Sequence, residues 1–236
     1  MFQRRRLKNP SRRARAAPGR RERNKLDKVH RIKAAAKALF AERGFDRATT
    51  RAIARRARVG LGTLFNYADD KRDLVFLIFI EELDRLADEA FGGVDPRQPL
   101  LEQLAAAFAH YYRRFGDNAR LARILLQELT FYSHGRLAAD FQRSRRRTVG
   151  FIEQLVTRAQ RDGRVRTDVD AAFVALSIFF IYSGAVRWWI AGDSPKPKGG
   201  IAELRKLLEL HLSGVTHRSA PAEHRGLRRV RTEIRR

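Results

Sequence analysis

Apolar residues recur at three- and four-residue spacing along most of the chain, which is the period of amphipathic helices. Stretches with glycine and proline interrupt this pattern and end the helices that it predicts. The predicted helices cover residues 26–44, 71–91, 100–115, 117–131, 136–161, a segment that opens at Asp168 or Asp170, and residues 201–212. Alternation of apolar and polar residues, the pattern of β-strands, never extends beyond a few positions. We therefore predict an all-α protein.

Residues 49–74 carry the pattern of two short helices joined by a three-residue turn. Apolar residues anchor both helices, and a small residue stands where the helices cross. These anchors are Ile53, Ala54, Ala57, Val59, Leu64 and Tyr67. Asp70 then occupies the position expected of the N-cap of the next helix. The pattern is that of a helix-turn-helix, whose second helix is free to lie in the major groove of DNA.

A run of sixteen uncharged residues, 171–186, forms the most apolar stretch of the chain. A membrane span needs about twenty apolar residues, and this run is bounded by Asp170 and Arg187. A helix that is apolar on all sides in a protein that works in water is buried on all sides. We therefore favour a helix that faces its own domain on one side and a second subunit on the other, and we expect no membrane partner.

The formal net charge of the chain is +24, and its distribution is uneven. Residues 1–25 carry +10, residues 26–75 carry +6 and residues 214–236 carry +5. Such charge favours polyanions, because each neutralised phosphate releases condensed counterions. We expect residues 1–25 to form a disordered basic arm, either touching DNA or solvated, and residues 214–236 to form a basic tail. An alternative function is therefore a non-specific binder of nucleic acid or anionic membranes.

Several classes of enzyme find no support in the sequence. The chain has no cysteine, so thiol catalysis, disulfides and thiolate metal sites are excluded. Its six histidines lack metal-ligand spacing, and no G-x-S-x-G motif occurs. We predict no enzymatic activity, no metal and no cofactor.

Five short stretches around the helix-turn-helix match a known family. They are Gly44-Phe45, Ala48-Thr49-Thr50-Arg51-Ala52-Ile53-Ala54, Ala57-Arg58-Val59, Gly62-Thr63-Leu64-Phe65-Asn66-Tyr67 and Asp70-Lys71-Arg72-Asp73-Leu74. On these residues the chain resembles the tetracycline-repressor (TetR/AcrR) family of bacterial transcriptional regulators. The close match spans residues 26–75, and the remainder agrees in its helical layout.

The resemblance implies a three-helix DNA-binding domain at residues 26–75 and a helical ligand-binding and dimerisation domain at residues 76–213. It further implies a cytoplasmic bacterial homodimer that binds a palindromic, double-stranded DNA operator. Release of that operator by a small ligand is the usual mode of control, most often in a repressor.

Eight residues are the DNA-binding candidates on the same resemblance. They are Thr49, Arg51, Arg58, Gly62, Thr63, Asn66, Tyr67 and Lys71. Thr49 is expected to cap the first motif helix, and Lys71 to meet a phosphate at the positive end of the next helix. Arg58 replaces the glycine usual in the turn, which costs about 1 kcal/mol if the position needs a positive φ.

The C-terminal half has an aromatic-rich interior, which suits a small lipophilic or aromatic ligand. The candidate ligand-binding residues are Phe108, Tyr111, Tyr112, Phe131, His134, Phe151 and Phe180. The resemblance also implies that the last two helices form the dimer. The candidate interface residues are Phe173, Leu176, Phe179, Phe180, Leu207, Leu208 and His211.

Overall fold

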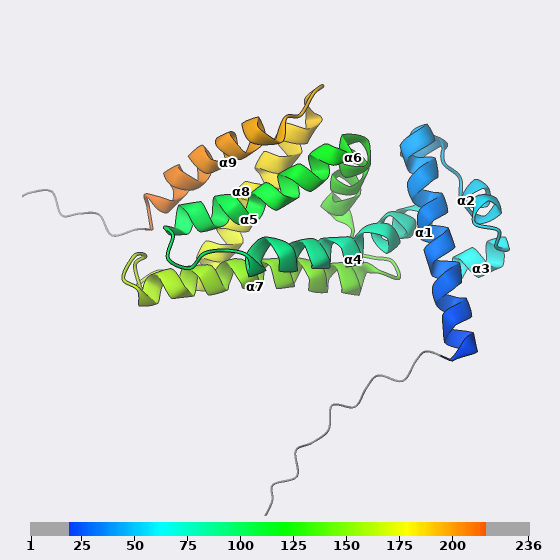
Figure 1. The fold of residues 1–236 in the computed structure, drawn as a ribbon, viewed down its shortest axis with the longest axis horizontal. Coiled ribbons are helices and arrows are strands. Elements are labelled where there is room, and N and C mark those ends of the chain that lie inside the picture. Colours follow the sequence, from blue (N-terminus) through cyan, green and yellow to red (C-terminus); the bar gives the residue numbers. More distant parts are fainter. Residues whose placement is uncertain (1–18, 216–236) are drawn as a thin grey trace, which may run out of the picture.

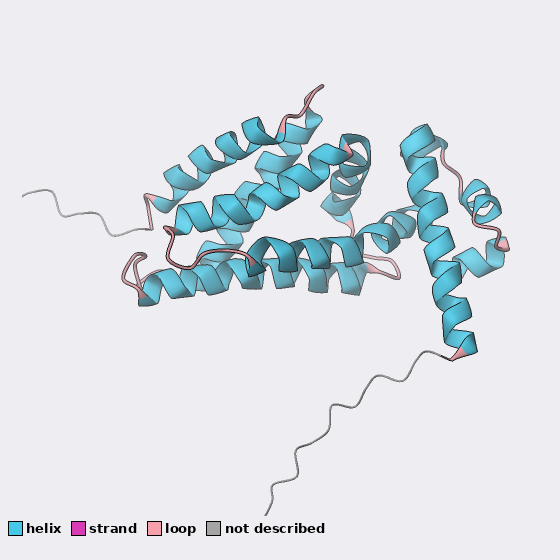
Figure 2. Ribbon diagram, viewed as in Figure 1, coloured by secondary structure: helices cyan, strands magenta, loops and turns pink. Residues whose placement is uncertain are grey.

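The computed structural model describes residues 19–215, so the predicted arm before Gly19 and the predicted tail after Val215 lie outside the described part. Within this range the chain is helical and contains no strand, which confirms the all-α prediction (Figure 1 and Figure 2). The elements are α1 (Arg20–Arg47), α2 (Thr50–Arg56), α3 (Leu61–Phe65), α4 (Lys71–Gly92), α5 (Leu100–Asp117), α6 (Ala119–Glu128), the short 3-10 helix η1 (Leu129–Phe131), α7 (Ala138–Arg161), α8 (Ala171–Ala191) and α9 (Pro197–Leu212).

The helices form two parts of unequal size. Helices α1, α2 and α3 stand together at one end of the molecule, and α5 to α9 form an elongated bundle at the other (Figure 1). Helix α4 belongs to both parts, because it packs against α1 as well as α5 and α7. The boundary drawn at residues 75/76 from the sequence therefore falls inside one continuous helix, which connects the two parts directly.

Helix α1 begins at Arg20, six residues before the start predicted at Leu26. Residues 20–25 thus belong to a helix, and the prediction of a disordered arm over 1–25 is wrong for them. The reason is helix propensity, because arginine, lysine and glutamate lose little side-chain freedom in a helix. The predicted stop at Gly44 is present as a break inside α1, where the backbone has φ +78° and ψ 171°.

Apolar side chains of the first three helices and the start of α4 form the N-terminal end of the hydrophobic core, which continues into the bundle. Its fully buried members include Ile32, Ala36, Phe40, Ile53, Leu64, Leu74 and Val75. Ion pairs and caps surround these residues, among them Arg56–Glu42 and the Thr49 cap. The recognition helix expected at α3 is anchored in this core through Leu64.

The C-terminal bundle is built on α8, which packs against α7 and α9. Its buried residues follow helical spacing and are Val174, Ala175, Ile178, Tyr182, Val186 and Ile190. Within residues 19–215, α8 is the one helix long and apolar enough to cross a membrane, judged by length and composition. Its other face carries exposed aromatic side chains, which are described below.

Helix α9 starts at Pro197, four residues before the predicted start at residue 201. Proline is well placed at the first position of a helix, because its fixed φ is helical and no N–H is needed there. Gly200, in the first turn, lies against Tyr112; a Cβ at that position would come within 2.5 Å of the tyrosine ring. Close packing between α5 and α9 therefore requires this glycine.

Candidate DNA-binding and ligand-binding sites

The turn between α2 and α3 closes with the hydrogen bonds of a Schellman motif. The amide of Val59 donates to the carbonyl of Ala54 at 3.1 Å, and the amide of Arg58 donates to the carbonyl of Arg55 at 3.1 Å. This motif requires a left-handed residue, and Arg58 has φ +54°, alone among the described non-glycine residues. Arg58 therefore has the positive φ at which a non-glycine residue costs about 1 kcal/mol of stability.

Helix α1 holds the same turn from the opposite side. The Arg31 guanidinium donates through Nη1 to the carbonyls of Ala57, at 3.0 Å, and Arg58, at 3.2 Å. Its Nε donates to Asp27 at 3.0 Å. These bonds satisfy carbonyls that the end of α2 leaves free, and they fix the direction of α1 relative to the turn.

The predicted DNA-binding residues surround α3, and none of them is fully buried. Thr49 caps α2 as expected, because its side-chain oxygen accepts from the amide of Ala52 at 3.1 Å. The exposed or half-exposed candidates are Arg51, Arg58, Gly62, Thr63, Asn66 and Tyr67. Phe65 was not among the predicted DNA-binding residues, yet it is 39% exposed on α3 beside the buried Leu64. An exposed aromatic ring there suits apolar contact with a thymine methyl group.

Lys71 opens α4 and is fixed in place. Its Nζ donates to the carbonyl of Asp46 at 3.2 Å and lies 4.3 Å from the centre of the Phe45 ring. The preceding Asp70 caps the helix, accepting from the amide of Asp73 at 2.8 Å. Lys71 therefore presents its charge at a helix N-terminus, which is favourable for a phosphate.

The segment from η1 to the start of α7, residues 129–137, connects the bundle to the end of α3; we call it the junction segment. Arg136 donates from Nη1 to the carbonyl of Asn66 at 3.2 Å and from Nη2 to the carboxylate of Asp69 at 2.6 Å. Asn66 is the C-cap of α3. Arg136 thus connects the junction segment directly to the C-terminal end of α3 by a hydrogen bond.

A second, buried contact also connects the junction segment to the N-terminal part. The hydroxyl of Tyr132 donates to the carboxylate of Asp73, which is 1% exposed and also accepts from the amide of Asp69 at 2.8 Å. Burial raises the pKa of Tyr132, as does the neighbouring carboxylate, so the hydroxyl keeps its proton. Gly135, with φ +130°, leaves room for the pair, since a Cβ would come within 2.7 Å of Asp73 Oδ1.

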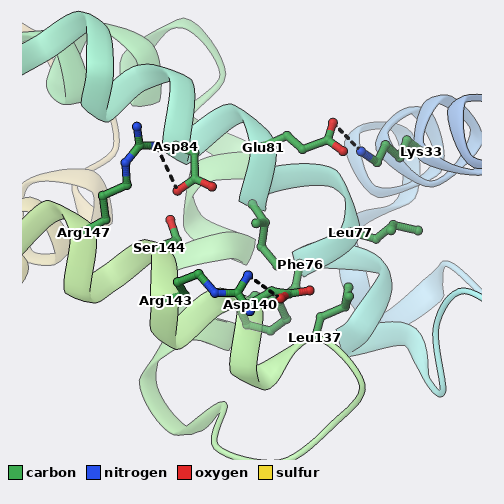
Figure 3. Close-up of a pocket in the computed structure, with 11 residues that line it drawn as sticks. Lys33, Phe76, Leu77, Glu81, Asp84, Leu137, Asp140, Arg143, Ser144 and Arg147 are labelled. Atoms are coloured by element: carbon green, nitrogen blue, oxygen red, sulfur yellow. Dashed lines mark ion pairs between the residues drawn. The ribbon is translucent and has the colours of Figure 1, made fainter. Parts of the chain in front are cut away.

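A hollow of about 480 Å³ opens between α1, α4 and α7. Phe76 and Leu77 line it together with several charged side chains (Figure 3). Each cation of this lining has an acidic partner; the pairs are Lys33–Glu81, Arg143–Asp140 and Arg147–Asp84. Because these charges balance, the hollow has no evident preference for an anionic ligand.

A second cavity, of about 220 Å³, lies within the C-terminal bundle. Apolar side chains of α4 to α8 dominate its lining, among them Leu83, Phe115, Leu126, Leu129, Phe141, Phe179 and Val186. Its volume is below the range of roughly 300–1,000 Å³ that is typical of ligand pockets. A ligand of ordinary size would have to displace part of the lining. Leu129 and Thr130, which belong to the junction segment, form one side of it.

Arg187 introduces a cation at the edge of this cavity. Its Nη1 donates to the carbonyl of Ser183 at 2.7 Å, and its buried Nε has no hydrogen-bond partner. Burial lowers the pKa of Arg187 from its ordinary value, although a guanidinium remains charged. A half-buried cation that lacks a carboxylate within residues 19–215 favours an anionic group on a ligand.

The predicted ligand-binding residues divide between this cavity and other places. Tyr111 and Phe180 line the cavity. Phe108 and Tyr112 are fully buried core residues, Phe151 stacks on Phe91, and His134 is exposed beside Ser133. Those four do not line the cavity. Phe108, Tyr112 and Phe151 pack in or against the ordinary hydrophobic core, and His134 faces solvent. The side chain of Phe131 lies outside the described part.

Helices α8 and α9 share an exposed apolar face. Four of the predicted interface residues are exposed on it: Phe173, Leu176, Phe180 and Leu207. His211 is half-buried and its Nε2 lies 2.9 Å from Ser177 Oγ, whereas Phe179 lines the cavity. Leu208 is 0% exposed, so its placement at an interface is wrong. It packs inside its own chain, whereas the preceding residue, Leu207, faces outward. Trp188, 83% exposed, and Leu210, 74% exposed, were missed.

Comparison with known proteins places this geometry in context. A model of bacterial regulatory proteins of the tetR family matches residues 32–78, and a model of the tetracyclin repressor-like C-terminal domain matches residues 97–195. The fatty acid metabolism regulator protein of Bacillus subtilis is 22% identical over 191 residues, which is 81% of this chain and 97% of that protein.

Two solved structures share the fold. Thermus thermophilus FadR in complex with lauroyl-CoA has a TM-score of 0.65 at 24% identity, covering 82% of this chain and 98% of that chain. Bacillus subtilis FadR in complex with stearoyl-CoA has a TM-score of 0.64 at 22% identity, covering 79% and 98%. These likenesses concern the arrangement of the helices.

Proposed function

This chain belongs to the TetR family of DNA-binding transcriptional regulators, and from that premise we propose that it is a homodimeric repressor released from a palindromic operator by a fatty acyl thioester. The observation that carries the proposal is the junction segment, which lines the apolar cavity at one end and holds the recognition helix at the other. We expect the protein to work in the bacterial cytoplasm, where operator and acyl thioesters both occur.

The exposed face of α8 and α9 supports the dimer. Monomeric proteins rarely expose large contiguous apolar patches, and six large apolar side chains remain exposed on these two helices alone. The residues are Phe173, Leu176, Phe180, Trp188, Leu207 and Leu210. A second copy packed on this face would present two α3 helices, and a twofold dimer requires an operator of matching symmetry, with half-sites one DNA turn, roughly 34–36 Å, apart.

The chemistry of the cavity supports an acyl thioester as ligand. Its apolar walls suit a hydrocarbon chain, and Arg187 and Arg145 supply cations at its edge. Both solved structures named above contain acyl-CoA, which combines a long apolar chain with several phosphates. A molecule with one apolar end and one anionic end satisfies both features of this cavity.

The path from ligand to DNA follows the junction segment. An acyl chain larger than the cavity has to displace its lining, and Leu129 and Thr130 are continuous with the residues that hold α3. Displacement of this segment would pull on Arg136 and Tyr132, whose partners are Asn66, Asp69 and Asp73. The ligand-bound arrangement then no longer suits the operator, and the coupling is reciprocal, since DNA must weaken ligand binding by the same factor.

The experiment that tests the DNA-binding part is selection of duplexes from a random library, followed by fluorescence anisotropy against scrambled controls at two salt concentrations. We expect a palindromic site that is bound better than scrambled DNA at physiological salt. Winners no tighter than scrambled DNA, with affinity collapsing as salt rises, would instead support the non-specific polyanion binder. Tyr67→Ala separates the two readings, because it weakens operator binding and leaves electrostatic binding nearly unchanged.

A further inference from the structure

The first three turns of α1 extend beyond the N-terminal core. Residues 20–28 are all exposed, and burial begins at Ile32. Arg31 contacts the turn before α3, so the residues that precede it run past that turn into open space, as the dark blue end of α1 shows (Figure 1). At 1.5 Å per residue, residues 20–30 project by roughly 16 Å. No apolar packing explains why the chain forms this helix here.

The projecting turns are strongly basic. Residues 20–31 contain six basic and two acidic side chains, for a net charge of +4. One acidic residue, Asp27, is occupied by Arg31 at 3.0 Å. The remaining excess is therefore positive and faces solvent, in a helix whose direction Arg31 fixes.

Three of the cations lie on one particular side of the helix. Arg21, Lys25 and Lys28 precede the buried Ile32 by eleven, seven and four residues, which are three, two and one helical turns. They therefore continue the stripe by which α1 packs toward the other helices of the N-terminal part. Glu22 and Asp27 fall on other sides of the helix at this spacing. The stripe changes from apolar to basic at the point where the chain has no more protein to pack against.

We propose that Arg21, Lys25 and Lys28 form a helical clamp on the phosphates of duplex DNA beside the site that α3 reads. The inference rests on the proposed operator binding by α3. It adds a contact to the phosphate backbone, which does not depend on the base sequence. Rigid helical presentation matters, because the three cations reach the backbone without first ordering a flexible arm. Duplex DNA is the favoured partner over a membrane because α3 brings it to this side of the molecule, and the three cations form a row with no exposed apolar face beside them on that stripe.

The test compares two variants with equal charge loss. The first is Arg21→Gln/Lys25→Gln/Lys28→Gln, in which glutamine preserves helix propensity. The matched control is Arg146→Gln/Arg158→Gln/Arg161→Gln, which removes three exposed cations from α7, in the bundle rather than beside α3 (Figure 1). Anisotropy titrations at several salt concentrations use the selected operator with and without ten added base pairs on each side.

We expect the α1 variant to lower the slope of log affinity against log salt by about 2–3 per subunit, because each phosphate contact contributes about 0.9. The added base pairs should strengthen binding by the wild type and by the α7 variant, and not by the α1 variant. Preference for the operator over scrambled DNA should remain in all three proteins. The charge-preserving variant Arg21→Lys/Lys25→Arg/Lys28→Arg should keep the wild-type slope.

Three outcomes would overturn the clamp. The α1 variant could keep the wild-type slope and the benefit of added base pairs, or it could lose its sequence preference, which a flanking contact does not determine. Stronger retention of anionic vesicles than of duplex by the wild type, lost in the α1 variant, would also overturn it in favour of a membrane surface. Failure of the proposed function is distinguishable, since the wild type itself would then show no preference for any site.

Discussion

The two parts of the molecule treat their apolar residues differently. In the described N-terminal part, two large apolar side chains are exposed, Leu26 and Phe65. In α8 and α9, six are exposed. The first part exposes Phe65 where DNA is expected. The second exposes an apolar face on α8 and α9, which we propose a second subunit covers.

This difference separates what a residue does for folding from what it does for binding. Leu64 and Phe65 are neighbours on α3, yet one is fully buried and the other 39% exposed. Leu208 and Leu210 differ in the same way on α9, at 0% and 74% exposed. Each pair therefore offers a matched test, in which one substitution affects stability and the other affects a partner.

The largest effect is expected at the buried position of α3. Leu64→Ala should lower the free energy of unfolding by about 2–5 kcal/mol, because it leaves a cavity in the hydrophobic core. Phe65→Ala should change stability by no more than about 0.5 kcal/mol and weaken operator binding instead. Urea unfolding followed by circular dichroism measures the first, and anisotropy the second. Equal loss of stability in both variants would contradict the comparison.

The next effect concerns the exposed face of the bundle. Trp188→Asp/Leu210→Asp should weaken dimerisation by more than about 2 kcal/mol, because buried aromatic anchors dominate such interfaces, while the helix content of the chain stays unchanged. Light scattering after size exclusion measures the mass across micromolar concentrations. Leu26→Asp is the control, since it places one such charge on an exposed apolar position of α1. A wild type that is monomeric throughout would contradict the dimer.

Arg136 allows the connection between the two parts to be broken. Arg136→Gln removes an ion pair with Asp69 that is partly exposed, so the cost in stability should stay near 0–1 kcal/mol. Operator affinity should fall by a few-fold, and a saturating ligand should change it much less than in the wild type. Arg143→Gln is the control, because its ion pair with Asp140 lies within α7. Identical ligand responses of the two variants would exclude the junction segment as the path.

A smaller effect is expected in the turn of the DNA-binding part. Arg58→Gly relieves the strain of a positive φ and should raise stability by up to about 1 kcal/mol, less the entropy that glycine loses on folding. Arg58→Val should lower stability, because a β-branched residue tolerates that conformation poorly. Urea unfolding of both variants checks the order glycine, arginine, valine. A reversed order would show that the Arg58 side chain itself stabilises the turn.

The smallest effect is a dependence on pH at His211. Burial lowers the pKa of His211 below its ordinary value of 6.5, so the unfolded chain takes up a proton first as the pH falls. Stability should therefore decrease from about pH 6.5 downward until the folded form is protonated as well. His211→Gln should remove this part of the pH profile in thermal unfolding, and His134→Gln, at an exposed site, should not. An unchanged profile in His211→Gln would contradict the assignment.

Local signals in the sequence, together with the family resemblance, were enough to predict most of the N-terminal part. The Thr49 and Asp70 caps, the turn at Arg58 and the anchors Ile53 and Leu64 all depend on residues within a few positions of each other. The start of α1 was missed because its first turns have propensity without an apolar period. The start of α9 was missed because Pro197 and two glycines resemble a loop until Tyr112 is seen against Gly200.

Long-range contacts explain the remaining errors. Arg136 and Asn66 are seventy positions apart, so no local pattern connects them. Leu207, Leu208 and Leu210 are equally apolar, and only packing against the rest of the bundle decides which of them faces outward. The same holds for the cavity, where Tyr111 lines the space and Tyr112 does not.

The most direct test of the account titrates the operator complex of the dimer with lauroyl-CoA and stearoyl-CoA, with coenzyme A and free fatty acid as controls, and follows DNA release by fluorescence anisotropy. We predict saturable release by the acyl thioesters at one molecule per subunit, no release by coenzyme A, and weaker release from Arg187→Gln. Operator affinity that does not change at acyl-CoA concentrations shown by calorimetry to saturate the protein would contradict the central claim that cavity and recognition helix are coupled.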